Sequence, residues 1–181
     1  VGNVERGAVT TAKDCAYLYG GPRGFSREGV DSLVLRYLRL EAKDRDLKEW
    51  EDIVHLVYNP KAEVTIGIVG KYVEYEDSYK SLKEALVHGA LAHNLKLNLN
   101  WREAEGLVTG ERTYEEQLAD YDGLMVPGGI GKRGSEGRLL AIRDARGNKV
   151  PDFGMCPRVQ RACLRLAREV CGLEEERPSD V

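Results

Sequence analysis

The sequence predicts an α/β fold in which helices and strands alternate around a doubly wound, mostly parallel sheet. Short apolar runs of strand length recur between residues 64 and 155. Segments with helical periodicity separate these runs, and the connections are short, as in βαβ units. Two of the runs lead directly into glycines, at Gly70 and Gly128. Parallel strands often end in this way at the edge of the sheet that carries function.

The expected strands lie at residues 64–69, 95–101, 122–126 and 152–155. The first is a buried apolar run, and the second alternates apolar and polar side chains. Helices are expected from Ser78 onward, across residues 136–146, and after Cys156. The last of these has apolar positions at Val159, Ala162, Cys163, Leu166 and Val170. This order of elements predicts a flavodoxin-like sheet.

The first 63 residues have a different character. Residues 1–25 are rich in glycine and are expected to be irregular. An amphipathic helix is expected from Val30 to Leu38. A second helix should open at Asp46, with Glu49 as its capping-box partner, and stop before Pro60. Two helices and a loose leader do not make a domain. We therefore expect residues 1–45 to be the tail of a larger domain, 46–63 a linker, and 64–181 part of the α/β domain.

Composition narrows the class of protein. The 181 residues are 42% hydrophobic and 31% charged, which suits a soluble globular protein. No apolar run is long enough to span a membrane, and the start of the chain lacks the layout of a signal peptide. The expected location is therefore cytoplasmic. A net charge of -3 gives no reason to expect nucleic acid as a partner.

The cysteines and histidines do not predict a metal site. Four cysteines occur without a CxxC pair and are expected to be free thiols, two of them, Cys163 and Cys171, in the core. The histidines are His55, His88 and His93, which all precede Cys156. No cluster has the spacing of zinc ligands.

The segment around Cys156 points most clearly to chemistry. Residues 151–161 read PDFGMCPRVQR, a short strand ending in Gly-x-Cys before a helix. Such a sharp turn lifts a nucleophile out of the sheet, and the helix N-terminus lowers the pKa of a thiol. A buried structural cysteine is the alternative. The loop at 127–131, PGGIG, is not a Walker A motif. Paired with Cys156, it could supply Gly129 N–H to an oxyanion hole, with residue 157 expected to supply the other donor.

Several of these motifs resemble the CTP synthase family. Residues 64–72 (VTIGIVGKY), 77–86, 126–137 (VPGGIGKRGSEG) and the Gly-x-Cys turn with Gln160 are similar to its glutaminase domain. Residues 19–31 and Trp50 resemble the end of its synthetase domain and the linker. The resemblance covers nearly the whole chain in the right order, and so implies an internal fragment of a CTP synthase.

The resemblance implies an enzyme that hydrolyses glutamine and uses the ammonia to convert UTP to CTP with ATP and Mg²⁺. GTP activates glutamine hydrolysis in this family, and the enzyme is a homotetramer. Cys156 matches the nucleophile. The glutamine-binding positions are matched by Gly128, Gly129, Pro157, Arg158, Val159, Gln160 and Asp180, and the GTP region by Ile130 and Arg133. None of the cofactors is expected to bind the fragment alone.

The chain also departs from the family pattern. The family reads G-x-C-L-G-M-Q at the nucleophile, whereas Pro157 and Arg158 follow Cys156 here. Pro157 lacks the N–H expected to complete the oxyanion hole. Asp152 replaces an apolar residue in a strand expected to be buried on both faces, and Ile130 replaces a phenylalanine beside the GTP site. The family's catalytic His and Glu would lie beyond Val181, and its P-loop before Val1.

Two functions from different classes follow. The chain is either a fragment of the enzyme, expected to be inactive alone, or a non-catalytic amidotransferase-like remnant that acts as a binding or assembly module. Pro157 and Arg158 favour the second. A stand-alone cysteine hydrolase is disfavoured, since no histidine follows Cys156.

Overall fold

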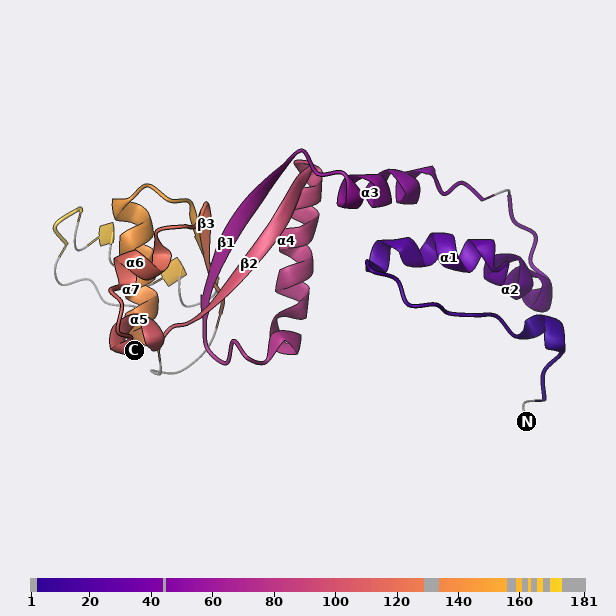
Figure 1. Ribbon diagram of the computed structural model, residues 1–181, viewed down its shortest axis with the longest axis horizontal. Coiled ribbons are helices and arrows are strands. Elements are labelled where there is room, and N and C mark those ends of the chain that lie inside the picture. Colours follow the sequence, from indigo (N-terminus) through magenta and orange to yellow (C-terminus); the bar gives the residue numbers. More distant parts are fainter. Residues whose placement is uncertain are drawn as a thin grey trace. The chain divides into compact units, whose positions relative to one another are not determined.

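The computed structural model describes residues 3–43, 45–128, 134–155, 159–160, 163, 166–167 and 170–173 (Figure 1). The chain divides into two compact units, Val1–Lys61 and Ala62–Val181. The first contains helices only, and the second contains the sheet. No helix in the described ranges is long and apolar enough to cross a membrane.

Within its described residues, 3–43 and 45–61, the first unit contains two short 3₁₀ turns and three α-helices. They are η1 (Arg6–Ala8), η2 (Leu18–Gly20), α1 (Gly21–Arg27), α2 (Val30–Leu38) and α3 (Lys48–Tyr58). The helix α1 falls largely in the stretch expected to be irregular, so that prediction is wrong there. Pro22 lies in the first turn of α1, where its missing N–H has no intrahelical partner to lose. The glycines at positions 20, 21 and 24 concealed this helix.

The start of α3 differs from the expected capping box. Its N-cap is Leu47, which makes no side-chain hydrogen bond. The Asp46 carboxylate accepts a hydrogen bond from the Lys48 backbone N–H at 2.9 Å. In a capping box the Asp46 carboxylate would accept from the N–H of Glu49, three residues on. Here it accepts from Lys48, two residues on, and the box with Glu49 is not formed. The predicted end of this helix agrees with the structure, since α3 stops at Tyr58 and Asn59 caps it.

No helix of the first unit contains a buried residue. Large apolar side chains remain exposed on α2 and α3, among them Leu38 at 61% and Trp50 at 39%. Packing of an apolar face supplies most of the stability of a helix in a protein. The described part of this unit therefore lacks the core that would stabilise its helices independently.

The second unit confirms the predicted fold class. Its four strands are β1 (Ala62–Gly70), β2 (Leu95–Glu103), β3 (Gly123–Val126) and β4 (Asp152–Gly154). All neighbouring pairs are parallel, and the order is β2-β1-β3-β4, as in a flavodoxin-like sheet. The register pairs Ile66 with both Leu99 of β2 and Gly123 of β3.

Helices cover both faces of this sheet (Figure 1). After β1, η3 (Glu76–Tyr79) leads into α4 (Lys80–Ala92), which packs against β2. The other helices are α5 (Gly106–Thr109), α6 (Tyr114–Leu118) and α7 (Ser135–Gly147), and α7 contacts β1, β3 and β4. Right-handed crossovers explain why helices lie on both faces. The chain moves from β1 to β2 in one direction across the sheet, and from β2 to β3 and from β3 to β4 in the other, so the connecting helices fall on opposite faces.

Two of these helices were not predicted from the sequence. The helices α5 and α6 span only four and five residues, too few for a helical period to emerge. A readable signal did exist for α6. Thr113 and Glu116 form a complete capping box, with Glu116 N–H donating to Thr113 Oγ1 and Thr113 N–H donating to the Glu116 carboxylate.

The hydrophobic core lies between the sheet and the layer formed by α5, α6 and α7. It includes Val69 of β1, Leu124 and Val126 of β3, and Leu118 of α6, all at most 3% exposed. Gly67 of β1 has no side chain, and this leaves room for the ring of Tyr121. A Cβ built on Gly67 would lie only 2.5 Å from the Tyr121 ring. The core is thus packed against the backbone of the central strand.

The strand β4 lies at an edge of the described sheet. Asp152 and Phe153 are both exposed, Phe153 at 62%. The expectation that Asp152 lies in a strand buried on both faces is therefore wrong for the described residues, because β3 is the only strand that pairs with β4 there. Partial burial still raises the pKa of the Asp152 carboxyl, and Arg146 opposes this effect.

Candidate active site at the carboxyl edge of the sheet

Two strand ends meet where the sequence predicted the active site. The strands β3 and β4 are parallel neighbours, with Val126 in register with Gly154. Beyond the last pair, Met155 N–H donates a hydrogen bond of 3.1 Å to the Val126 carbonyl. The segment that leads to Cys156 and the segment that leads to the glycine loop therefore leave the sheet at the same edge.

The two segments reach solvent at this edge in different ways. Val126 is fully buried and Pro127 is buried, whereas Gly128 is exposed. On the neighbouring edge strand Gly154 is half-buried and Met155 is 40% exposed. A buried strand and an exposed edge strand therefore lead into solvent-accessible residues at one edge, where parallel sheets commonly bind ligands.

Helical residues follow β4 closely in the sequence. The strand β4 ends at Gly154, and Val159 and Gln160 are helical and exposed. Cys156 thus falls between a strand and a helix, as the sequence of a nucleophile elbow requires. The described helical positions beyond Gln160 are residues 163, 166 and 167.

Most of the predicted site residues lie outside the described part of the chain. The structure places Gly128 after β3, and Val159 and Gln160 in helical positions. The predictions for Cys156, Gly129, Ile130, Arg133, Pro157, Arg158 and Asp180 concern residues outside the described ranges. Their roles stay predictions.

The three histidines belong to other elements than the two strand ends at this edge. His55 belongs to α3 of the first unit, and His88 belongs to α4. His93 follows α4 and precedes the first residue of β2, so it lies at the opposite, amino edge of the sheet. The nine residues of β2 extend over about 26 Å at roughly 3.3 Å per residue. His93 is therefore too distant to act as a base at the carboxyl edge.

The burial of the cysteines after β4 differs from the prediction. Cys163 and Cys171 are exposed free thiols, and so is Cys15. The expectation that Cys163 and Cys171 lie in the core is wrong. The apolar side chains of the same segment are also exposed, with Val159 at 49% and Leu166 at 45%. Within the described residues nothing buries the apolar stripe that the sequence pattern assigned to the core.

The end of β1 is supported by contacts that the sequence pattern did not reveal. Tyr79 donates a hydrogen bond of 2.6 Å from its hydroxyl to the Lys71 carbonyl, and its ring packs against Trp101 at 5.2 Å. Burial raises the pKa of the Tyr79 hydroxyl. These contacts fix the turn after β1 at the carboxyl edge of the sheet.

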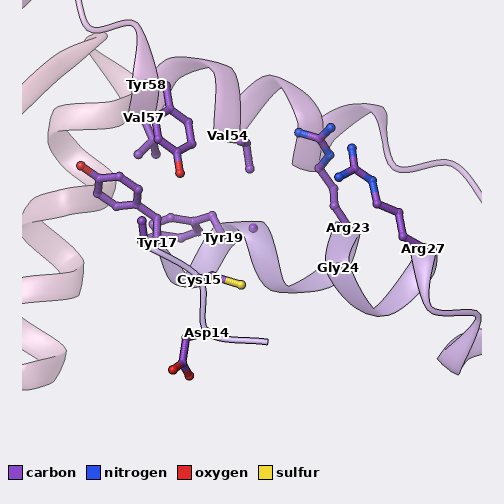
Figure 2. Close-up of a pocket in the computed structure, with 12 residues that line it drawn as sticks. Asp14, Cys15, Tyr17, Tyr19, Arg23, Gly24, Arg27, Val54, Val57 and Tyr58 are labelled. Atoms are coloured by element: carbon purple, nitrogen blue, oxygen red, sulfur yellow. The ribbon is translucent and has the colours of Figure 1, made fainter. Parts of the chain in front are cut away.

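A separate hollow lies within the first unit (Figure 2). It encloses about 380 Å³, and all of its lining residues fall between Asp14 and Tyr58. In Figure 2, Arg23 and Arg27 extend from one side, while Tyr17, Tyr19 and Tyr58 gather at the other. Arg23 also lies 3.7 Å from Glu51. Among the predicted glutamine-site residues that the structure describes, Gly128, Val159 and Gln160, none lines this hollow.

The fold and the strand ends define a class: an α/β protein with a flavodoxin-like parallel sheet, in which two neighbouring strands lead into the glycine-rich and cysteine-containing segments. The family model described as "Glutamine amidotransferase class-I" matches residues 74–179. The chain belongs to the class-I glutamine amidotransferase family.

The similar proteins indicate a narrower group within this family, the CTP synthases. The chain is 64% identical to the CTP synthase of Koribacter versatilis (strain Ellin345) over 178 residues, which cover 98% of this chain and 32% of the relative. It is 58% identical to the CTP synthase of Acidobacterium capsulatum over the same shares. The chain therefore spans about a third of the length of the CTP synthases it matches.

A solved structure agrees with this result. The glutaminase domain of Trypanosoma brucei CTPS with bound acivicin shares 35% identity with this chain at a TM-score of 0.53. The match covers 62% of this chain and 43% of the trypanosomal chain. Together with the predicted resemblance, these comparisons confirm that the chain is homologous to CTP synthases.

Proposed function

We propose that this chain carries the glutamine-hydrolysing site of a CTP synthase and that Cys156 is its nucleophile. The observation that supports the proposal best is the parallel pairing of β3 and β4, extended by the Met155–Val126 hydrogen bond. This pairing directs the glycine loop and the segment before Cys156 to one edge. A substrate carbonyl bound between them could be attacked from one segment and stabilised by the other.

The chemistry follows from a thiolate and an amide. The Cys156 sulfur forms a bond to the side-chain carbonyl carbon of glutamine, and the carbonyl oxygen becomes an oxyanion. The carbon–nitrogen bond then breaks, and ammonia leaves after its nitrogen accepts a proton. Water hydrolyses the resulting thioester, which releases glutamate and restores the thiol. The nucleophilic form of cysteine persists in a reducing compartment, and we propose that the protein acts in the cytoplasm.

Backbone groups would hold the substrate. We propose that Gly128 and Gly129 line the glutamine site together with residues 157–160, and that Asp180 contributes to binding. Gly129 N–H is the proposed oxyanion donor. Pro157 cannot donate, and loss of one donor costs about 10²–10³ in rate. We therefore expect slower hydrolysis than in a relative with an N–H at this position.

In the proposed whole reaction, the ammonia aminates UTP to form CTP at the expense of ATP. The enzyme is proposed to be a homotetramer activated by GTP near Ile130 and Arg133. ATP would supply the phosphoryl group that activates UTP, with Mg²⁺. Within the described ranges no three His, Cys, Asp or Glu residues are placed to hold a metal ion. No step of the ATP-dependent half-reaction is therefore assigned to these residues.

One sequence feature favours a second candidate function. Pro157 and Arg158 stand at the turn after Cys156, where a tight turn and a free N–H would serve catalysis. A chain with these residues could keep the fold as a binding or assembly module and lack turnover. The two candidates differ in whether Cys156 reacts with a molecule bound in a glutamine site.

Site-directed labelling of the cysteines separates these candidates. The purified chain is incubated with acivicin, the compound bound to the trypanosomal glutaminase domain, and peptide mass spectrometry measures the adduct on each cysteine. If the proposal is right, Cys156 is labelled first and millimolar glutamine slows its labelling at least fivefold, whereas glutamate has little effect. Cys156→Ala removes the protected adduct.

The other thiols provide an internal control. Cys15, Cys163 and Cys171 are exposed and should react at similar rates with and without glutamine. Labelling that follows exposure alone, with no glutamine protection at Cys156, contradicts the glutaminase proposal and supports the binding module.

A further inference from the structure

The hollow of the first unit is built by three segments that lie apart in the sequence. Its walls come from residues 14–20, from α1 and from α3, and α1 contributes Arg23, Gly24 and Arg27. A second hollow of about 520 Å³ shares four residues with the first, among them Gly24 and Arg27, so the recess extends along α1. Because no helix of this unit contains a buried residue, both hollows belong to its surface and are not gaps in a core.

One side of the hollow is positively charged. Arg23 and Arg27 lie four residues apart on α1, so their side chains leave the same face of the helix. Figure 2 shows both guanidinium groups pointing in the same direction from this helix. Gly24, between them, adds no side chain, and a Cβ built there would meet nothing within 4 Å. Each guanidinium carries a planar fork of N–H donors that matches a carboxylate or a phosphate, so the pair is suited to one anionic group.

Nearby carboxylates leave the charge of these arginines largely uncompensated. Glu51 approaches Arg23 to 3.7 Å, which is longer than a hydrogen bond, and its side chain is 58% exposed. Asp14 is the one acidic residue among those that line the hollow. In Figure 2 its carboxylate points away from both guanidinium groups. Two positive charges therefore face the hollow, and the one negative charge of its lining is turned away from them.

The other side of the hollow is aromatic and apolar. Tyr17 and Tyr58 form an edge-to-face pair, with ring centroids 5.3 Å apart and an interplanar angle of 88°. They are 47% and 59% exposed, so ring surface remains accessible. Val54 and Val57 of α3 also line the hollow. Because aromatic rings favour offset or edge-on contacts with other rings, this side is suited to an aromatic group.

We propose that this hollow binds a small organic anion that carries an aromatic ring. The anionic group, a carboxylate or a phosphate, lies on Arg23 and Arg27, and the ring packs against Tyr17 and Tyr58. The inference does not rest on the proposed glutaminase function, because the hollow lies within the first unit and none of these residues is a predicted glutamine-site residue.

The two sides of the hollow should act together. An anion alone would contact partly exposed arginines, whose attraction is screened by salt. A ring alone would bury only the apolar surface that two tyrosines and two valines offer. A ligand with both groups joins α1 to α3, and binding to the folded unit stabilises it. We therefore expect ring and anion in one molecule to bind more tightly than either does separately.

Phenyl phosphate and benzoate are the probes, because each combines one ring with one anionic group. They are titrated into the full chain labelled with ¹⁵N, and inorganic phosphate and benzyl alcohol serve as controls. We expect saturable amide shifts at Tyr17, Gly24, Val54 and Tyr58, with β1 and β3 unmoved. The tighter of the two probes should bind about tenfold more tightly than either control. Absence of a saturable shift for both probes, or equal affinity for inorganic phosphate, overturns the proposal.

Three substitutions of arginine by glutamine test the anionic side. Arg23→Gln and Arg27→Gln should each weaken binding of the tighter probe about tenfold, since a charge-assisted contact is lost. Arg36→Gln is the matched control, because it removes the same charge from the same unit. Arg36 also approaches a glutamate, at 3.9 Å, and lines neither hollow, so the affinity should change less than about twofold. Equal weakening by all three variants overturns the proposal, because general electrostatic attraction predicts it.

Tyr58→Ala tests the aromatic side. It should weaken binding of the tighter probe and leave the binding of inorganic phosphate unchanged, and equal losses for both overturn the placement of the ring. The amide spectrum shows whether each variant is folded. Should Arg23→Gln not fold, Arg27→Gln, at an exposed position, decides the anionic side. Saturating probe should also slow hydrogen exchange in α1 and α3 but not in β1, and unchanged exchange in both helices contradicts a ligand held between them.

Discussion

Replacing Leu118 with alanine tests the least expected part of the core. Leu118 is the last residue of α6, is 2% exposed, and belongs to the same core cluster as Leu124 and Val126 of β3. The change deletes three carbons, worth about 2.4 kcal/mol at roughly 0.8 kcal/mol for each buried methylene. A residual cavity adds more, and measured Leu→Ala substitutions in cores cost about 2.7–5 kcal/mol. We expect a loss of about 3 kcal/mol in the free energy of unfolding.

The loss should be measured by urea unfolding at pH 7, followed by far-UV circular dichroism, and by thermal melting. The unit from Ala62 to Val181 has 120 residues, so 3 kcal/mol corresponds to a fall in Tm of about 12 °C, given an unfolding entropy of about 2.1 cal/mol/K per residue. An unchanged slope of the urea transition would show that stability rather than the unfolded state has changed.

Val108→Ala is the control for this experiment. Val108 lies in the neighbouring helix α5 but is 53% exposed, so its truncation should alter stability by less than about 0.5 kcal/mol. Similar losses in the two variants, or a loss below 1 kcal/mol for Leu118→Ala, would refute the placement of Leu118 in the core.

Further predictions concern the sheet, a buried carboxylate, the first unit and catalysis. Gly67→Ala should cost about 1–3 kcal/mol in urea unfolding, because the new Cβ meets the Tyr121 ring; a neutral result contradicts the close packing. Burial raises the pKa of Asp144, and the nearby Glu115 adds to the effect. The folded state then binds the proton more tightly, so stability falls as the pH rises from about 4 through the raised pKa. Asp144→Asn should therefore raise the Tm at pH 7 and reduce its dependence on pH between 4 and 7; a lower Tm at pH 7 argues against this account. Hydrogen exchange should be faster in residues 3–61 than in β1 and β3, and equal protection would show that the first unit has a core of its own. The purified chain should release no ammonia from glutamine at a useful rate, since no histidine follows Cys156 and His93 lies at the amino edge of the sheet; Cys156-dependent turnover near 1 per second or more would show that another base acts.

The sequence predicted the sheet well because its strands carry strong local signals. The run from Val64 to Val69 is apolar on both faces, as a central parallel strand requires, and β1 occupies it between two neighbours. The same reasoning failed for Asp152, since a short strand at an edge can carry a charged residue that a central strand cannot. Local periodicity does not reveal which strand lies at the edge.

The candidate site was predictable to a different extent. The Gly-x-Cys turn and the glycine loop are local motifs, and the sequence was enough to place both after strands. Their approach to one edge depends on the pairing of β3 with β4, which joins residues 28 positions apart, such as Val126 and Gly154. The close approach of α7 to the Ala104 backbone at Gly137 was not readable from sequence, because it depends on a distance between elements far apart in the chain. A glycine within a helical pattern gives no indication of what faces it.

Glutamine binding followed by NMR tests the central claim, that the carboxyl edge at β3 and β4 is a glutamine site. The chain is labelled with ¹⁵N and titrated with glutamine, and glutamate serves as the control ligand. We expect saturable amide shifts for the non-proline residues of 126–129 and 154–160, with the amino edge near Ala62 and Leu95 unmoved. Shifts that gather instead around the hollow of Arg23 and Tyr58, or the absence of any saturable shift, would contradict it.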